Sequence, residues 1–149
     1  MFRLSNRSLS ILATVHEDMQ KVVKRAIEIT KVDFGVIQGR RTLDEQCRLY
    51  GKGRSPAQCA AVGCPREYSD MTKRQVTWID PRKGNHLSGN AVDLAAYVNG
   101  KIDWDNLDLY REISVAMKKA AAELKIPIAW GGDWKNTKDF PHYELRVQK

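Results

Sequence analysis

The sequence predicts an α+β fold in which a small antiparallel sheet packs against helices. Two long segments, residues 8 to 30 and 106 to 125, carry apolar residues at helical spacing, whereas shorter apolar or alternating segments are separated by turn residues. A chain of 149 residues, 42% of them hydrophobic, is long enough for one proper core and short for two. We therefore expect a single domain over residues 1 to 149.

The first half of the chain predicts a long helix, a strand and a shorter helix. From Ser8 to about Thr30 one amphipathic helix is expected, with His16 on its flank. FGVIQ at residues 34 to 38 is a short strand. A capping box in TLDEQCRLY, which begins at Thr42, predicts a helix that stops at Gly51.

Residues 51 to 84 show little periodicity, because glycine and proline interrupt them, and only QVTWI at residues 75 to 79 could form a short strand. Cys47, Cys59 and Cys64 are an odd number in a chain too long to need a disulfide framework. We expect free thiols, although Cys59 and Cys64 could close a small loop.

The segment AVDLAAYV, residues 91 to 98, is predicted to be a strand that turns back through Asn-Gly into residues 101 to 104. It contains Asp93, and a carboxylate inside an apolar strand is costly to bury unless it is paired or binds a cation. His86, in the preceding loop, is the nearest candidate. A hydrogen-bonded pair and a metal shared by both residues remain open at this point.

The end of the chain predicts a helix and two strands. Asn106 can cap the helix, which Pro127 ends, and residues 126 to 130 form a strand. In the last strand, residues 142 to 147, alternation places His142 and Glu144 on one face and Tyr143 on the core face.

His86, Asp93 and His142 together are a suitable set of ligands for one zinc ion. A catalytic zinc takes three protein ligands and keeps a fourth position for water. Hydrolysis also needs a carboxylate near that water, and Asp139, three residues before His142, is the first candidate, with Glu144 as its competitor.

Several motifs in order resemble one family of zinc peptidases. They are HxxGxAxD at residues 86 to 93, DxxH at 139 to 142, GxRT at 39 to 42 and WGGDW at 130 to 134. The family includes D-alanyl-D-alanine carboxypeptidases and dipeptidases and the L-alanyl-D-glutamate endopeptidases of phage endolysins. The likeness covers roughly residues 34 to 147.

The resemblance implies a single domain like those of hedgehog proteins and DD-peptidases, and a zinc-dependent activity. It implies that His86, Asp93 and His142 bind one Zn²⁺, that Asp139 is the acid/base, and that Arg41 binds substrate or stabilises the tetrahedral oxyanion.

Four further residues are candidates for supporting the ligands or lining the substrate groove: Glu144, Ser88, Trp130 and Trp134. Either tryptophan could instead belong to the core. The family often has serine two residues before its first histidine, where this chain has Gly84, so a hydroxyl contact to substrate is in question there.

The resemblance implies hydrolysis of an amide bond in the stem peptide of peptidoglycan. L-Ala-D-Glu is the expected bond, because no cell-wall-binding module is appended. D-Ala-D-Ala cleavage is the alternative within the family. Both phage lysis and bacterial protein release through phage-type lysis genes are settings for such compact endopeptidases.

A net charge of +7 and a pI of about 9.4 favour anionic partners and motivate a rival of another class, a nucleic-acid-binding protein or metal nuclease. The basic residues are scattered, however, and no cluster of aromatics offers a stacking platform, so we expect no nucleic acid. An inactive wall-binding module would need neither Asp139 nor Arg41.

Neither a classical signal peptide nor an apolar run of membrane-spanning length is visible in the sequence. We expect a monomer made in the cytoplasm that reaches peptidoglycan in the periplasm or cell wall with a holin-like helper.

Overall fold

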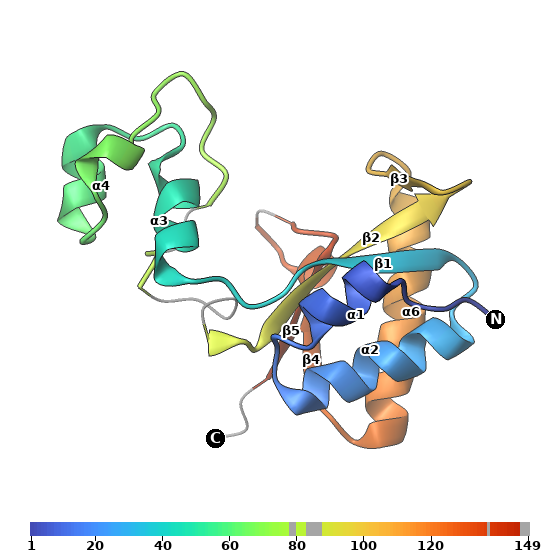
Figure 1. Ribbon diagram of the computed structural model, residues 1–149. Coiled ribbons are helices and arrows are strands. Elements are labelled where there is room, and N and C mark those ends of the chain that lie inside the picture. The colour runs from blue at the N-terminus through green and yellow to red at the C-terminus, as the bar shows by residue number, and fades with distance from the viewer. Residues whose placement is uncertain (78–79, 83–87, 137, 147–149) are drawn as a thin grey trace. The chain divides into compact units, whose positions relative to one another are not determined.

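The computed structural model describes residues 1–77, 80–82, 88–136 and 138–146 (Figure 1). The chain divides into two compact units, one formed by Met1–Arg40 with Gly89–Lys149 and the other by Arg41–Ser88. Each unit is described by itself, and the expectation of one domain stays a prediction. Among the described residues, no helix has the length and apolar character needed to cross a bilayer.

The first unit contains a five-stranded sheet in which every pairing is antiparallel. Its strands follow the order β1-β2-β5-β4, and β3 pairs with the far end of β2. Their bounds are β1 Asp33–Gln38, β2 Ala91–Val98, β3 Lys101–Asp103, β4 Ile128–Trp130 and β5 His142–Leu145. The predicted α+β class with a small antiparallel sheet is confirmed.

Three helices accompany this sheet: α1 Asn6–Leu12, α2 Glu17–Ile29 and α6 Leu107–Leu124. The helices α2 and α6 lie side by side (Figure 1). Their apolar side chains share one buried cluster with alternate residues of β2, namely Val92, Leu94 and Ala96. Tyr143 of β5 joins the same cluster, as the alternation in the last strand predicted.

The prediction of one continuous helix from Ser8 to Thr30 is wrong. Ser5 caps α1, and the chain leaves the helix before His16, whose ring Nδ1 accepts a hydrogen bond from the backbone N–H of Asp18 and so caps α2. The backbone N–H of His16 also donates to the carbonyl of Gly89. A contact with a distant segment thus breaks a helix that local periodicity would continue.

The hairpin is confirmed, because Asn99 (φ 52°) and Gly100 (φ 79°) both adopt the left-handed conformation that a tight two-residue turn requires. Asn106 caps α6 as predicted. The helix ends in a left-handed residue, Lys125, two positions before Pro127.

The second unit contains α3 Leu43–Gly51, α4 Pro56–Ala61 and a single 3₁₀ turn, η1 Arg66–Tyr68. The capping box between Thr42 and Glu45 is present as predicted. The short strand predicted for QVTWI is not formed at residues 75 to 77, the part of this segment that the structure describes. The last two residues of the segment lie outside the described residues.

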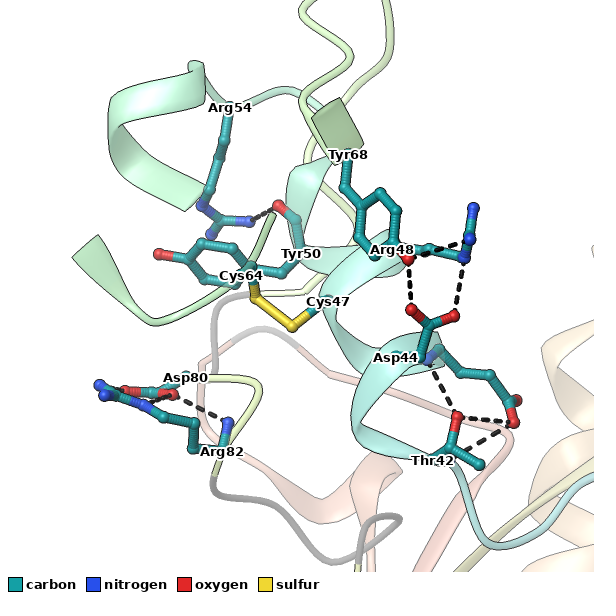
Figure 2. The surroundings of a disulfide bond; sticks show 11 residues. Thr42, Asp44, Cys47, Arg48, Tyr50, Arg54, Cys64, Tyr68, Asp80 and Arg82 are labelled. Atoms are coloured by element: carbon teal, nitrogen blue, oxygen red, sulfur yellow. Dashed lines mark hydrogen bonds and ion pairs between the residues drawn. A yellow bond between two sulfur atoms is a disulfide. The ribbon is translucent and has the colours of Figure 1, made fainter. Parts of the chain in front are cut away.

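The cysteines differ from the expectation of free thiols. Cys47 on α3 and Cys64, after α4, form a disulfide (Figure 2). Cys59 is a buried thiol. The pairing of Cys59 with Cys64 that their spacing suggested is therefore wrong, because packing of α3 beside α4 brings Cys47 to the same buried cluster.

Candidate metal site

The sheet of the first unit places Asp93 and His142 directly opposite each other. Asp93 is the third residue of β2 and His142 the first of β5, and they are paired across the ladder. Directly opposed residues project from the same face of a sheet. The carboxylate Oδ1 of Asp93 lies 3.4 Å from Nδ1 of His142, and both side chains are largely buried.

Asp139 is held near this pair by a short segment whose three carbonyls all accept hydrogen bonds. The carbonyl of Asp139 accepts from the N–H of His142, that of Phe140 from the indole N–H of Trp130, and that of Pro141 from the N–H of Leu94. Satisfied backbone groups fix a segment that has no regular structure of its own.

Gly131 completes this arrangement. Its carbonyl accepts a hydrogen bond from the backbone N–H of Asp139 at 3.0 Å, and a Cβ added to Gly131 would overlap the Asp139 carbonyl. A glycine is therefore required for the two segments to approach. Sequence reasoning missed this role, although the Gly131-Gly132 pair inside WGGDW marked the position.

One ligand atom from each of Asp93, Asp139 and His142 lies within 4.8 Å of the others. These residues could hold a metal ion. The structure thus brings together two of the three predicted ligands and the predicted acid/base. The remaining ligand, His86, lies outside the described residues.

Glu144 lies on the other side of the histidine ring. Its Oε1 is 2.7 Å from Nε2 of His142, so one imidazole nitrogen meets Glu144 and the other meets Asp93. Burial disfavours a charged imidazole, but the hydrogen bonds and charges of Asp93 and Glu144, with the charge of Asp139, outweigh burial and raise the pKa of His142 to about 9. The site strongly favours positive charge.

The two tryptophans divide between core and site. Trp130 is 6% exposed and stacks near Tyr143 in the buried cluster, so it is a core residue that also positions Phe140. Trp134 is partly exposed, and its ring lies 5.1 Å from the ring of His142. Trp134 is thus the tryptophan that borders the candidate site.

The remaining candidates, Arg41 and Ser88, belong to the second unit. The guanidinium of Arg41 donates from Nη1 to Oε1 of Gln46 on α3 at 3.2 Å, and its Nε is buried. Ser88 is exposed. Gln46 therefore positions the side chain of Arg41.

Comparisons with known proteins agree over nearly the whole chain. A family model described as phage L-alanyl-D-glutamate peptidase matches residues 1–61 and 66–147. The L-alanyl-D-glutamate peptidase of Escherichia phage T5 is 32% identical over 145 residues, which are 97% of this chain and 90% of that protein. The peptidoglycan L-alanyl-D-glutamate endopeptidase CwlK of Bacillus subtilis (strain 168) is 27% identical over 150 residues, 88% of this chain and 75% of CwlK.

A solved structure is also similar. The crystal structure of the L-Ala D-Glu endopeptidase ChiX from Serratia marcescens superposes with a TM-score of 0.69 at 30% identity, and the match covers 97% of this chain and 90% of ChiX.

Proposed function

We propose, because the chain belongs to the phage L-alanyl-D-glutamate peptidase family, that it hydrolyses the amide bond between L-alanine and D-glutamate in the stem peptide of peptidoglycan. The single observation that carries the proposal is the convergence of Asp93, Asp139 and His142, whose ligand atoms lie within 4.8 Å of one another. The similar proteins are named as L-alanyl-D-glutamate peptidases or endopeptidases, which agrees with it.

One zinc ion is the proposed cofactor, with His86, Asp93 and His142 as its ligands. Zinc accepts imidazole nitrogen and carboxylate oxygen at about 2.0–2.2 Å, so two tetrahedral ligands lie roughly 3.3 Å apart. The 3.4 Å between Nδ1 of His142 and Oδ1 of Asp93 fits that spacing. Because Nε2 faces Glu144, Nδ1 is the nitrogen of His142 available to the metal.

Zinc bound here would polarise the scissile carbonyl and lower the pKa of a water molecule to about 7. Asp139 accepts the proton of the attacking water and delivers it to the leaving amine. Arg41 neutralises negative charge on the substrate or on the tetrahedral intermediate.

Residues around the ligands have supporting roles. Glu144 accepts the Nε2–H of His142 and so holds the ring with Nδ1 toward Asp93, an arrangement that raises the affinity of histidine for metal. Trp134, beside the histidine ring, lines the substrate groove, and Ser88 contacts substrate. Trp130 supports the site from the core.

The surroundings of the reaction follow from the substrate. We propose that the protein acts as a monomer on peptidoglycan in the periplasm or cell wall, after release by a holin-like helper, in phage lysis or in phage-type protein release. The net charge of +7 favours approach to an acidic wall. Membership in a peptidase family argues against the nucleic-acid-binding alternative.

Mass spectrometry of products from purified peptidoglycan tests the proposal. New peptides that begin with D-glutamate are expected, and chelation of the metal should abolish their formation. Free D-alanine without those peptides would instead establish a D-Ala-D-Ala carboxypeptidase. Retention on DNA at physiological salt, with no peptide products, would favour the nucleic-acid-binding alternative.

A further inference from the structure

The apolar core of the second unit is made largely of sulfur-bearing side chains. Among its described residues the buried apolar cluster consists of Cys47, Cys59 and Cys64, and only Val62 and Tyr68 pack against it from partly buried positions. A unit of this size buries too little apolar surface to be stable by apolar burial alone and usually needs a covalent cross-link. The disulfide between Cys47 and Cys64 is that cross-link (Figure 2).

The other contacts of the unit are mostly exposed and weak. Asp44 and Arg48 form an ion pair within α3, and both form hydrogen bonds with the hydroxyl of Tyr68 in η1 (Figure 2). The side chains of Asp44 and Arg48 are exposed to solvent, where such contacts contribute little. Arg54 is the buried charged residue among the described residues of this unit, and it stacks on Tyr50 and donates to the carbonyl of Thr77. A single buried arginine leaves α3 and α4 dependent on the disulfide.

We propose that the Cys47–Cys64 pair is a redox switch that keeps the peptidase inactive while its thiols are reduced and activates it when the disulfide forms. The proposal rests on the proposed function, because peptidoglycan lies outside the cytoplasmic membrane, whereas the chain is made in a compartment that keeps thiols reduced. The enzyme would then become competent only after it reaches its substrate.

The oxidant is a disulfide, either a small molecule or a protein that exchanges dithiols for disulfides. The thiolate of one of the two cysteines attacks a sulfur of that disulfide, and a mixed disulfide forms as the first thiolate leaves. The thiolate of the other cysteine then displaces the second one. Two protein thiols are oxidised, one external disulfide is reduced to two thiols, and both protons pass to the departing thiolates.

The link to activity is α3. Cys47 follows Gln46 in this helix, and Gln46 accepts the hydrogen bond from the guanidinium of Arg41. The disulfide joins α3 to a residue 17 positions away, and closing a loop of that length favours the ordered unit by roughly 10²-fold. Without it, α3 opens and Arg41 loses its position.

The test compares the zinc-loaded protein in oxidised form with the same protein reduced by thiol and dialysed into zinc-containing, oxygen-free buffer. The oxidised protein is expected to release peptides beginning with D-glutamate at least 10-fold faster. Hydrogen exchange should show lost protection in α3 and α4 of the reduced protein, with the amides of β2 unchanged. Equal rates and equal protection in both forms would overturn the switch.

Two alanine variants provide matched controls, since each removes sulfur from the same cluster. Cys59→Ala keeps the disulfide and should retain the response to reduction. The double variant with Cys47→Ala and Cys64→Ala should have low activity in either buffer. If that double variant matches the oxidised wild type, the switch is wrong even though the peptidase function stands. If the oxidised wild type, with its disulfide verified, releases no peptide, the proposed function itself fails.

Discussion

The two compact units of the chain are held together by different chemistry. In the first unit, aliphatic and aromatic side chains from β1, β2, α2 and α6 form one large buried cluster. In the second, the described cluster contains three cysteines and two partly buried neighbours. Burial of apolar surface is insensitive to redox conditions, whereas a disulfide is lost on reduction. The difference predicts which changes should damage each unit.

The units also differ in where they bury charge. The first unit confines Asp93, His142 and Glu144 to one largely buried site, where two carboxylates flank one imidazole. In the second, the pair formed by Asp44 and Arg48 is exposed to solvent. Electrostatic changes should therefore have large effects in the first unit and small effects at the surface of the second.

The largest expected effect is that of Asp139→Asn. This change keeps the shape of the side chain but removes the proton acceptor, so the rate of hydrolysis should fall by about 10² to 10⁴. Zinc content and unfolding free energy should stay near those of the wild type. Metal content and turnover are to be measured together on each variant.

Glu144→Gln is the control for Asp139→Asn, because Glu144 contacts the histidine ring and is proposed only to orient it. The Glu144→Gln variant should lose less turnover than Asp139→Asn. Its zinc affinity should fall by about 10- to 100-fold. If Asp139→Asn bound zinc and stayed active while Glu144→Gln bound zinc and was inactive, Glu144 would be the general base and Asp139 would not.

Leu94→Ala tests the core of the first unit. Leu94 is fully buried on β2 beside Asp93, and its truncation should cost about 2–5 kcal/mol of unfolding free energy. Val62→Ala is the counterpart in the second unit and should cost about 1 kcal/mol in the oxidised protein, since Val62 is only partly buried. Hydrogen exchange should assign each loss to its own unit. Equal loss of protection in β2 and α3 would instead support the single cooperative domain that the sequence predicted.

The pH dependence of the metal-free protein tests the buried charge cluster. The pKa of His142, raised to about 9, exceeds the value of about 6.5 expected in the unfolded chain. Protonation therefore stabilises the fold, by at most about 3 kcal/mol. That contribution is complete below pH 6.5 and is lost as the pH rises through 9.

Urea unfolding of the metal-free protein at pH 6 and pH 9.5 measures this effect. Glu144→Gln should reduce the difference between the two pH values, because one of the two hydrogen-bonded carboxylates is gone. Zinc binding at pH 7 should release about one proton from His142, measurable by calorimetry in buffers of different ionisation enthalpy. Unchanged stability across this pH range would mean that His142 is neutral in the metal-free protein.

Arg41→Ala has a smaller expected effect on turnover. Loss of one charge-assisted hydrogen bond to substrate costs about 1.5–3 kcal/mol, so catalytic efficiency should fall by roughly 10- to 10²-fold while zinc is retained. Arg41→Lys should restore only part of it, because lysine lacks the planar donor fork. Arg40→Ala is the neighbouring control, and a loss in that variant alone would transfer the role to Arg40.

Local sequence signals predicted much of this structure. The Asn-Gly turn, the Thr42 capping box and the alternation around Tyr143 each depend on residues close together in the chain, and all are confirmed. A carboxylate in an apolar strand indicated that Asp93 needs a partner, and His86 was the residue named for it, whereas His142 was expected only as a further ligand of the same zinc ion. The direct pairing of Asp93 with His142 across the sheet was not predicted.

The features that sequence reasoning missed depend on contacts between distant segments. His16 ends one helix and begins the next with the help of Gly89, and Cys47 finds Cys64 only after α3 and α4 pack together. The requirement for glycine at position 131 arises from the approach of the Asp139 backbone. None of these contacts leaves a periodic signal in the sequence.

The smallest expected effect is that of Tyr143→Phe, which tests how completely the core of the first unit is satisfied. The hydroxyl of Tyr143 is buried without a hydrogen-bond partner among the described residues, and burial raises the pKa of this phenol well above its usual value, so it stays a neutral donor. Removing a buried hydroxyl that has no partner should change stability by less than about 1 kcal/mol, in the stabilising direction.

Tyr110→Phe is the matched control, since the equally buried hydroxyl of Tyr110 donates to the carbonyl of Asp103 at 2.8 Å, and its loss should cost about 1 kcal/mol. Chemical unfolding of both variants decides the matter: a larger loss in Tyr143→Phe than in Tyr110→Phe would reveal an ordered water bound to the Tyr143 hydroxyl.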